Sequence, residues 1–207
     1  RSMMISDFRL DVLILRVAAV LLALAIHEYA HAAAAVRLGD PGPKFDGRLT
    51  LNPLAHLDPV GTLMLFFFSF GWAKPVMVNP ARFKNPRRDM MWVALAGPLS
   101  NIALAFALAR LAPFILNIVP PGALRATWMF LQVSVQLNIW LAVFNMLPLP
   151  PLDGSKVLMG ILPRRYAYRY ARLESYGTVI LLLLVVSGML FRVLQPAYSA
   201  VARLVVG

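Results

Sequence analysis

The sequence predicts an all-α, multi-pass membrane protein with about four full transmembrane helices, a re-entrant segment and a small membrane-embedded β-strand region. Hydrophobic residues make up 60% of its 207 residues and charged residues only 14%, and the mean hydropathy is +0.71. Soluble domains are nearer half apolar and a quarter charged. A soluble fold of this size could not bury so much apolar surface, whereas a lipid bilayer accepts it.

Four apolar runs are long enough to cross a hydrocarbon core of about 30 Å at about 1.5 Å per helical residue. These runs are Leu10–Leu38, Met90–Phe114, Leu124–Leu147 and Gly177–Leu194. A fifth run, Val60–Trp72, is too short to cross alone, and Gly61 and Gly71 lie near its ends. This run is therefore expected to form a re-entrant or half-buried segment.

The composition changes on either side of that short run. Phe45–Asn52 and Pro75–Asn79 are strand-like and have turn residues around them. Strand or irregular backbone at membrane depth is tolerated only against protein or a water-filled cavity. These two segments predict the membrane-embedded β-strand region.

The net charge of +11 comes from Lys and Arg residues that cluster in loops between the apolar runs. They do not form a basic stripe interleaved with aromatics, so no nucleic-acid partner is expected. Lys74–Arg88 and Lys156–Arg172 are basic, whereas Leu111–Ala123 has no charged residue. By the positive-inside rule the two basic segments are cytoplasmic and Leu111–Ala123 is outside. The first span should then end in the cytoplasm, near Arg37.

Residues 1–207 are expected to form a single transmembrane domain. Arg1 and Ser2 precede Met3 and are interpreted as a remnant of cloning. The first apolar run is too long for the core of a signal peptide, so we expect it to be retained.

A histidine pair within the first span provides the strongest chemical signal. His27 and His31 are four residues apart and share one helical face, so both imidazoles can bind one zinc ion. Glu28 lies beside them and can act as a general base. Ionisable groups inside a membrane span are costly and usually functional. The alternative is a buried histidine pair satisfied by hydrogen bonds, with Glu28 facing a polar cavity.

A catalytic zinc ion uses three protein ligands and one open position. The chain has no Cys and only three His, so the third ligand is His56 or a carboxylate. Asp153 is favoured because it follows a proline-rich break at the cytoplasmic end of the Leu124–Leu147 run. Alternatively, Asp153 lies in a loop turn and caps a helix, and His56 only stabilises its own loop.

Two motifs and three further stretches carry a family resemblance. The motifs are H-E-x-x-H at residues 27–31 and N-x-x-P-x-P-x-L-D-G at residues 145–154, and the stretches are residues 47–59, 71–75 and 96–101. Together they resemble the site-2 protease family of intramembrane metalloproteases, in its short branch without appended PDZ or CBS domains. The resemblance extends from about Leu13 to Leu184.

The resemblance implies a role for each matching residue. It makes His27, His31 and Asp153 the ligands of one zinc ion per chain. It also makes Glu28 the general base, and Asn145 a contact for the substrate or the developing oxyanion. Four further residues are candidates for substrate binding, although Asn101 could instead serve packing between helices. These four are Asn101, His56, Val76 and Val78.

The expected function is therefore that of an intramembrane zinc metalloprotease. It would hydrolyse peptide bonds in or near the transmembrane segments of single-span membrane proteins. It would lie in the cell membrane as a multi-pass protein, with its active site near the cytoplasmic side. Two alternatives are a zinc-binding membrane carrier and a proteolytically inactive membrane chaperone.

Overall fold

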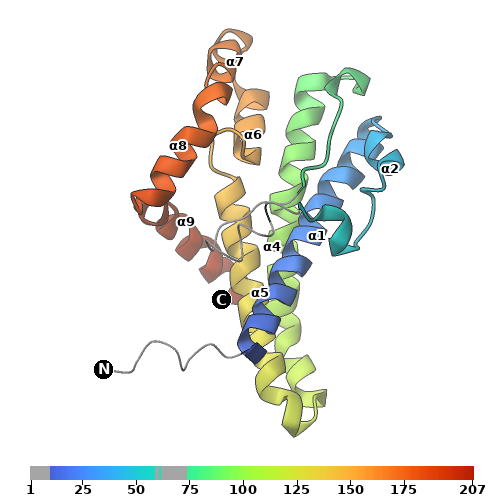
Figure 1. Ribbon diagram of the computed structural model, residues 1–207, viewed down its shortest axis with the longest axis vertical. Coiled ribbons are helices and arrows are strands. Elements are labelled where there is room, and N and C mark those ends of the chain that lie inside the picture. Colours follow the sequence, from blue (N-terminus) through green and yellow to red (C-terminus); the bar gives the residue numbers. More distant parts are fainter. Residues whose placement is uncertain (1–9, 59–60, 62–73) are drawn as a thin grey trace.

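The computed structural model describes residues 10–58, 61 and 74–207, and most of them are helical (Figure 1). The three longest helices are α1 (Leu10–Leu38), α4 (Pro86–Ile118) and α5 (Pro121–Asn145). The shorter elements are α2 (Gly42–Phe45), η1 (Pro53–His56), η2 (Pro80–Arg82), α6 (Asp153–Ile161), α7 (Arg164–Ala171), α8 (Glu174–Val186) and α9 (Met189–Val206).

Helices α1, α4 and α5 pack against one another and form the centre of the molecule (Figure 1). The buried face of α1 is built from alanines, namely Ala19, Ala23, Ala25, Ala32 and Ala35. Small residues let helix backbones approach closely, which is the usual basis of helix packing in membranes. This close packing brings polar groups of all three helices within hydrogen-bonding distance.

Four of the described helices are long and apolar enough to cross a membrane. Three of them, α1, α4 and α5, confirm predicted spans, and α1 has the predicted bounds of Leu10–Leu38. The fourth is α9 rather than the predicted run Gly177–Leu194.

The predicted span Gly177–Leu194 is wrong because the helix breaks inside it. Gly188 has a φ of 70°, in the left-handed region, and its N–H donates to the carbonyl of Val185. A left-handed glycine after the last helical turn is a common helix terminator. Helix α8 is left with 13 residues, about 20 Å at 1.5 Å per residue, which is too short to cross alone.

The β-strand region is also wrong, since neither Phe45–Asn52 nor Pro75–Asn79 forms a strand. Their backbone N–H groups donate to carbonyl oxygens within local turns or to side chains, and not to a neighbouring strand. Arg48 N, for example, donates to the carbonyl of Pro43, and Asn79 N donates to the Asp40 carboxylate. The predicted re-entrant run, Val60–Trp72, lies outside the described residues apart from Gly61 and stays a prediction.

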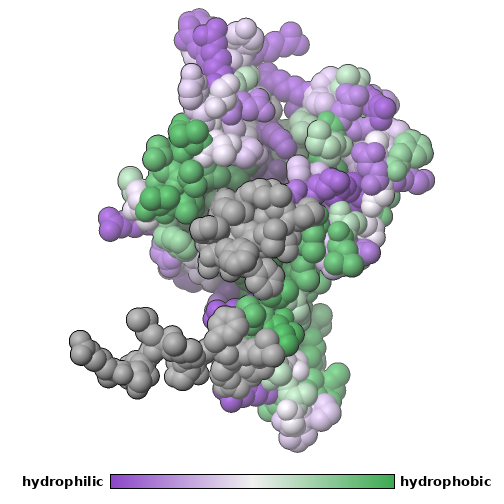
Figure 2. Space-filling view, in the orientation of Figure 1, coloured by the Kyte–Doolittle hydropathy of each residue, from purple (hydrophilic) through white to green (hydrophobic). Residues whose placement is uncertain are grey.

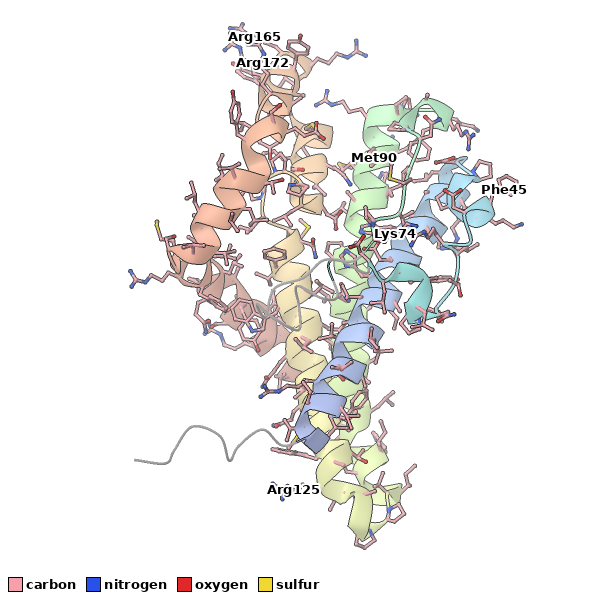
Figure 3. The ribbon with its side chains drawn as sticks, viewed as in Figure 1. Phe45, Lys74, Met90, Arg125, Arg165 and Arg172 are labelled. Atoms are coloured by element: carbon pink, nitrogen blue, oxygen red, sulfur yellow. The ribbon has the colours of Figure 1, made fainter. Side chains whose placement is uncertain are left out.

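Polar and apolar surfaces separate along the long axis of the molecule. Hydrophilic residues gather around α7 and the nearby end of α4, whereas hydrophobic residues cover α8 and the opposite end of α4 and α5 (Figure 2). Arg165 and Arg172 lie at one end of the molecule and Arg125 lies at the other (Figure 3).

Candidate metal centre

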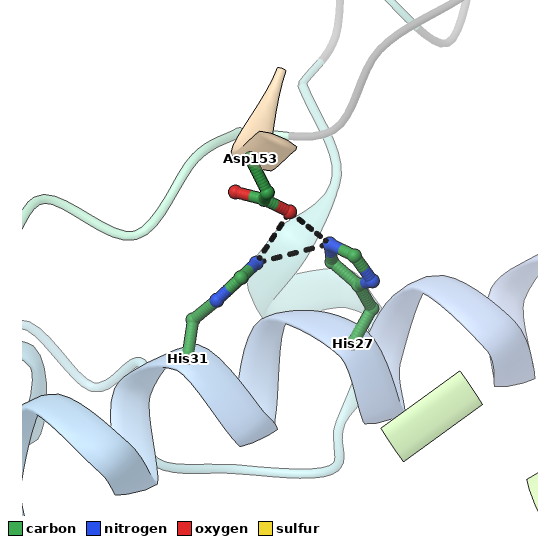
Figure 4. Close-up of side chains that lie close together, drawn as sticks. All are labelled: His27, His31 and Asp153. Carbon is green, nitrogen blue, oxygen red and sulfur yellow. Dashed lines mark hydrogen bonds and ion pairs between the residues drawn. The ribbon is translucent and has the colours of Figure 1, made fainter. Parts of the chain in front are cut away.

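Three buried side chains from two distant parts of the chain meet beside α1 (Figure 4), and each offers one donor atom to a metal ion. His27 and His31 project from one face of α1, and Asp153 is the first residue of α6. Asp153 Oδ2 lies 3.2 Å from His27 Nε2 and 3.1 Å from His31 Nε2. The two Nε2 atoms are 3.0 Å apart. Within the described ranges, these three residues are the group of His, Asp and Glu side chains that could hold a metal ion.

Asp153 reaches the histidines because the chain turns sharply after α5. Helix α5 ends at Asn145, and prolines follow at 148, 150 and 151, where a helix would lose hydrogen bonds and clash. Gly154 then packs directly against the carbonyl groups of Met146 and Leu147, and a Cβ atom there would collide with them. Asp153 is therefore both the start of a helix and a donor that faces the histidine pair.

The far nitrogen of each imidazole is held by a hydrogen bond. His27 Nδ1 lies 2.6 Å from Asn101 Oδ1, and His31 Nδ1 lies 2.7 Å from the carbonyl oxygen of Val93. A carbonyl oxygen only accepts, so Nδ1 of His31 is the donor, and in the neutral imidazole Nε2 carries the lone pair. Histidines that bind metals are generally oriented in this way.

A cavity of about 350 Å³ opens beside the three donors. Glu28 lines it, and the Glu28 Oε2 atom accepts a hydrogen bond of 3.2 Å from the backbone N–H of Val76. The remaining lining residues are His27, His31, Pro75, Val76, Val78, Met90, Val93, Ala94, Asn145, Pro151, Asp153 and Lys156.

The cavity brings together some of the predicted substrate contacts and not others. Val76, Val78 and Asn145 line it. Asn101 does not, because it is fully buried behind His27. His56 is also buried and away from the lining, and its Nε2 lies 2.9 Å from the carbonyl oxygen of Thr50.

Asp40 ties the segment over the cavity to the end of α1. Its buried carboxylate accepts hydrogen bonds from the backbone N–H of Asn79 at 2.7 Å and of Gly42 at 3.0 Å. It also pairs with the half-exposed Arg82 guanidinium at 2.8 Å. Burial raises the pKa of the Asp40 carboxyl, but these donors outweigh it and hold the pKa below its usual value. The carboxylate therefore fixes the segment that carries Val76.

Sequence reasoning missed three residues of this site. Gly97 of α4 packs against both imidazole rings, and the Val93 carbonyl orients His31. Lys156 lines the cavity one helical turn after Asp153. Two signals could have found Gly97 and Lys156. A glycine inside a span marks a close approach of helices, and positions i and i+3 share a helical face.

The donors fit a zinc ion. Two imidazole nitrogens and one carboxylate oxygen form a ligand set typical of catalytic zinc, which keeps a fourth position open for water or substrate. The set is buried, its histidines are oriented by hydrogen bonds, and a cavity adjoins it.

Known proteins resemble this chain in sequence over most of its length. The model of peptidase family M50 matches residues 115–188, which include Asn145 and Asp153. YwhC of Bacillus subtilis is 40% identical over 182 residues, which cover 84% of this chain and 81% of the relative. Rip2 of Mycolicibacterium smegmatis is 30% identical over 87% of this chain and 70% of the relative. Rip2 of Mycobacterium tuberculosis strain H37Rv is 33% identical over 84% of this chain and 67% of the relative.

All three relatives are provisionally named zinc metalloproteases. No solved structure matches the chain. The identities and the coverage of the relatives are high enough to establish the family, and the chain belongs to peptidase family M50, the site-2 proteases.

Proposed function

We propose that this protein is an intramembrane protease that cuts other membrane proteins in or beside their transmembrane segments. Its family makes it a zinc metalloprotease, and its apolar helices make it a multi-pass membrane protein. One observation carries the proposal further. Three buried donors converge beside a glutamate at the wall of a cavity, next to helices of membrane-spanning length.

In this proposal His27, His31 and Asp153 hold one zinc ion. Zinc bound there supplies Lewis acidity, which polarises water and the scissile carbonyl group. Glu28 accepts a proton from the attacking water on its carboxylate and later delivers it to the leaving amine. The Val76 N–H donates to Glu28 Oε2 and holds the carboxylate at the cavity wall. The other carboxylate oxygen of Glu28 then takes the proton. Asn145, which also lines the cavity, contacts the substrate or the developing oxyanion.

The substrate must unwind before cleavage, because the amide groups of a transmembrane helix are satisfied by its own backbone. Val76 and Val78 line the cavity in a segment that forms no strand with any other part of the chain that the structure describes. We assign these two residues to substrate binding. Single-span membrane proteins are the proposed substrates, and residues 1–207 act as one domain.

Water is proposed to enter from the cytoplasmic side. His31 lies six residues before Arg37, a distance of about 9 Å along a helix. Arg37 and the basic segments Lys74–Arg88 and Lys156–Arg172 mark that side by the positive-inside rule.

The position of the cut tests the proposed function. Purified protein is reconstituted in proteoliposomes with a tagged single-span membrane protein, and the new termini are mapped by mass spectrometry. Zinc-dependent cuts should fall within the transmembrane segment or next to it. Cuts that occur only in distant soluble regions would contradict an intramembrane protease. The control is the same reaction with a chelator, followed by restoration with added zinc.

Zinc content tests the ligands separately from activity. Purified protein should contain about one zinc ion per chain, as expected of a three-ligand catalytic site. Both His27→Ala and Asp153→Ala should contain well under half of that amount. His56→Ala is the matched control and should keep its zinc, since His56 lies away from the cavity. Elemental analysis gives the result, and full zinc content in both ligand variants would refute the assignment.

Membrane orientation can be measured by labelling, because the chain has no Cys. A single Cys beside Gly122 should react with an impermeant thiol reagent in intact cells. A Cys beside Arg165 should react only after the cells are permeabilised, as the positive-inside rule requires. The reverse pattern would place the basic segments outside and overturn the orientation.

A further inference from the structure

A chain of buried amide groups connects His27 to the interior of α5. Asn101 on α4 and Asn138 on α5 are both fully buried. Asn101 Oδ1 lies 2.6 Å from His27 Nδ1, and Asn101 Nδ2 donates to Asn138 Oδ1 at 2.8 Å. Asn138 Nδ2 in turn donates to the carbonyl oxygen of Ser134 at 2.8 Å. Each link is of normal hydrogen-bond length, so the chain is continuous from α5 through α4 to α1.

Two backbone carbonyl groups fix the direction of this chain. The carbonyl of Ser134 can only accept, so Asn138 must present its amide nitrogen there and its oxygen toward Asn101. The carbonyl of Ala23 accepts a second hydrogen bond from Asn101 Nδ2, at 3.1 Å. Both N–H groups of Asn101 are thereby used, and only its oxygen faces His27. An oxygen accepts, so His27 Nδ1 must be the donor.

The consequence appears at the other side of the imidazole ring. A neutral imidazole that carries its proton on Nδ1 has its lone pair on Nε2. His27 Nε2 is the atom that faces His31 and Asp153. A flipped amide at Asn101 would place an N–H group against Nδ1 and favour the tautomer that cannot bind a metal through Nε2.

We infer that Asn101 and Asn138 are positioning residues that set the tautomer and the ring angle of His27, with Asn138 acting through Asn101. This inference rests on the proposed role of His27 as a zinc ligand. It explains why a membrane protein keeps two buried amides where apolar residues would cost less. It also assigns a role in the metal centre to Asn138, whose side chain bonds to Asn101 and to the Ser134 carbonyl and reaches His27 only through Asn101. If the two residues only formed hydrogen bonds between helices, replacement of Asn138 would not change zinc binding.

The test compares zinc binding by three near-isosteric variants, Asn101→Leu, Asn138→Leu and the double variant. Loss of a group that orients a metal-binding histidine typically weakens metal binding about 10- to 100-fold, which is expected for Asn101→Leu. Asn138→Leu should weaken zinc binding about 3- to 10-fold, the effect of losing one neutral hydrogen bond. The double variant should bind zinc no more weakly than Asn101→Leu alone, because Asn138 acts only through Asn101.

Two readouts report on the site without relying on catalysis. Zinc affinity is measured by competition with a chelator, and ligand geometry by the visible absorption spectrum of the cobalt-substituted protein. The spectrum should change in both single variants. Gln136→Leu is the matched control, since it replaces an exposed amide on the same helix. It should match the wild type in both readouts.

The outcomes separate this inference from the proposed function. His27→Ala serves as the reference, and full zinc binding by it would overturn the metal site and the inference together. If His27→Ala loses zinc while Asn138→Leu keeps wild-type affinity, the inference alone is overturned. It is also overturned if the effects of the two single variants multiply in the double variant. Should Asn101→Leu fail to fold, as judged by size exclusion, Asn138→Leu decides the question by affinity and spectrum.

Discussion

Glu28→Gln is expected to slow peptide-bond cleavage about 10²- to 10⁴-fold, the range that one general acid–base group contributes. Glutamine has the same size and can keep the hydrogen bond from the Val76 N–H to its side-chain oxygen. It cannot accept a proton from water. Zinc content should stay near one per chain, because Glu28 is not one of the three grouped donors.

The measurement is the initial rate of cleavage of a tagged single-span substrate, normalised to zinc content. Glu174→Gln is the matched control, since Glu174 is exposed in the first turn of α8, and it should cleave at the wild-type rate. The variant also separates a protease from a zinc carrier, in which zinc movement would not need Glu28. A cleavage rate of Glu28→Gln within twofold of the wild-type rate would rule out Glu28 as the general base.

Sequence patterns identified α1 and its chemistry because both follow from local rules. A long apolar run predicts a membrane-length helix, and the spacing of His27 and His31 places both on one helical face whatever surrounds them. Asp153 is more distant in sequence. The prediction that it lies near the pair rested on the lack of Cys, on the proline-rich break at the cytoplasmic end of the Leu124–Leu147 run and on the family resemblance. The structure brings all three together, and their role as zinc ligands stays a prediction.

Other features depend on conformations or contacts that hydropathy does not report. The break between α8 and α9 depends on the left-handed conformation of Gly188, which a hydropathy profile cannot distinguish from a tolerated glycine inside a span. Pro75–Asn79 has strand-like composition, yet the Val76 N–H bonds to Glu28 and the Asn79 N–H bonds to Asp40. Both partners lie far away in the sequence, so composition alone could not exclude a strand.

Gly97→Ala is expected to weaken zinc binding about 100-fold or more and to remove most cleavage activity. Gly97 lies where α4 crosses the histidine pair of α1. A Cβ atom at this position would lie 2.6 Å from His31 Cε1 and 2.7 Å from His27 Cε1. Carbon atoms in contact are normally about 3.5–4.0 Å apart, so both rings or the helix itself must move by about 1 Å. Misplacement of a catalytic group by about 1 Å can cost about 100-fold in rate.

The rings cannot move without losing their partners. His27 Nδ1 is bonded to Asn101 on α4, and His31 Nδ1 is bonded to the Val93 carbonyl on the same helix. A shift of α4 would therefore carry both partners away from the pair. Gly122→Ala is the control, because a Cβ atom there meets nothing within 4 Å. Zinc affinity by chelator competition and cleavage of the tagged substrate give the comparison. Wild-type zinc affinity in Gly97→Ala would show that α4 does not pack against the imidazoles as closely as the structure has it.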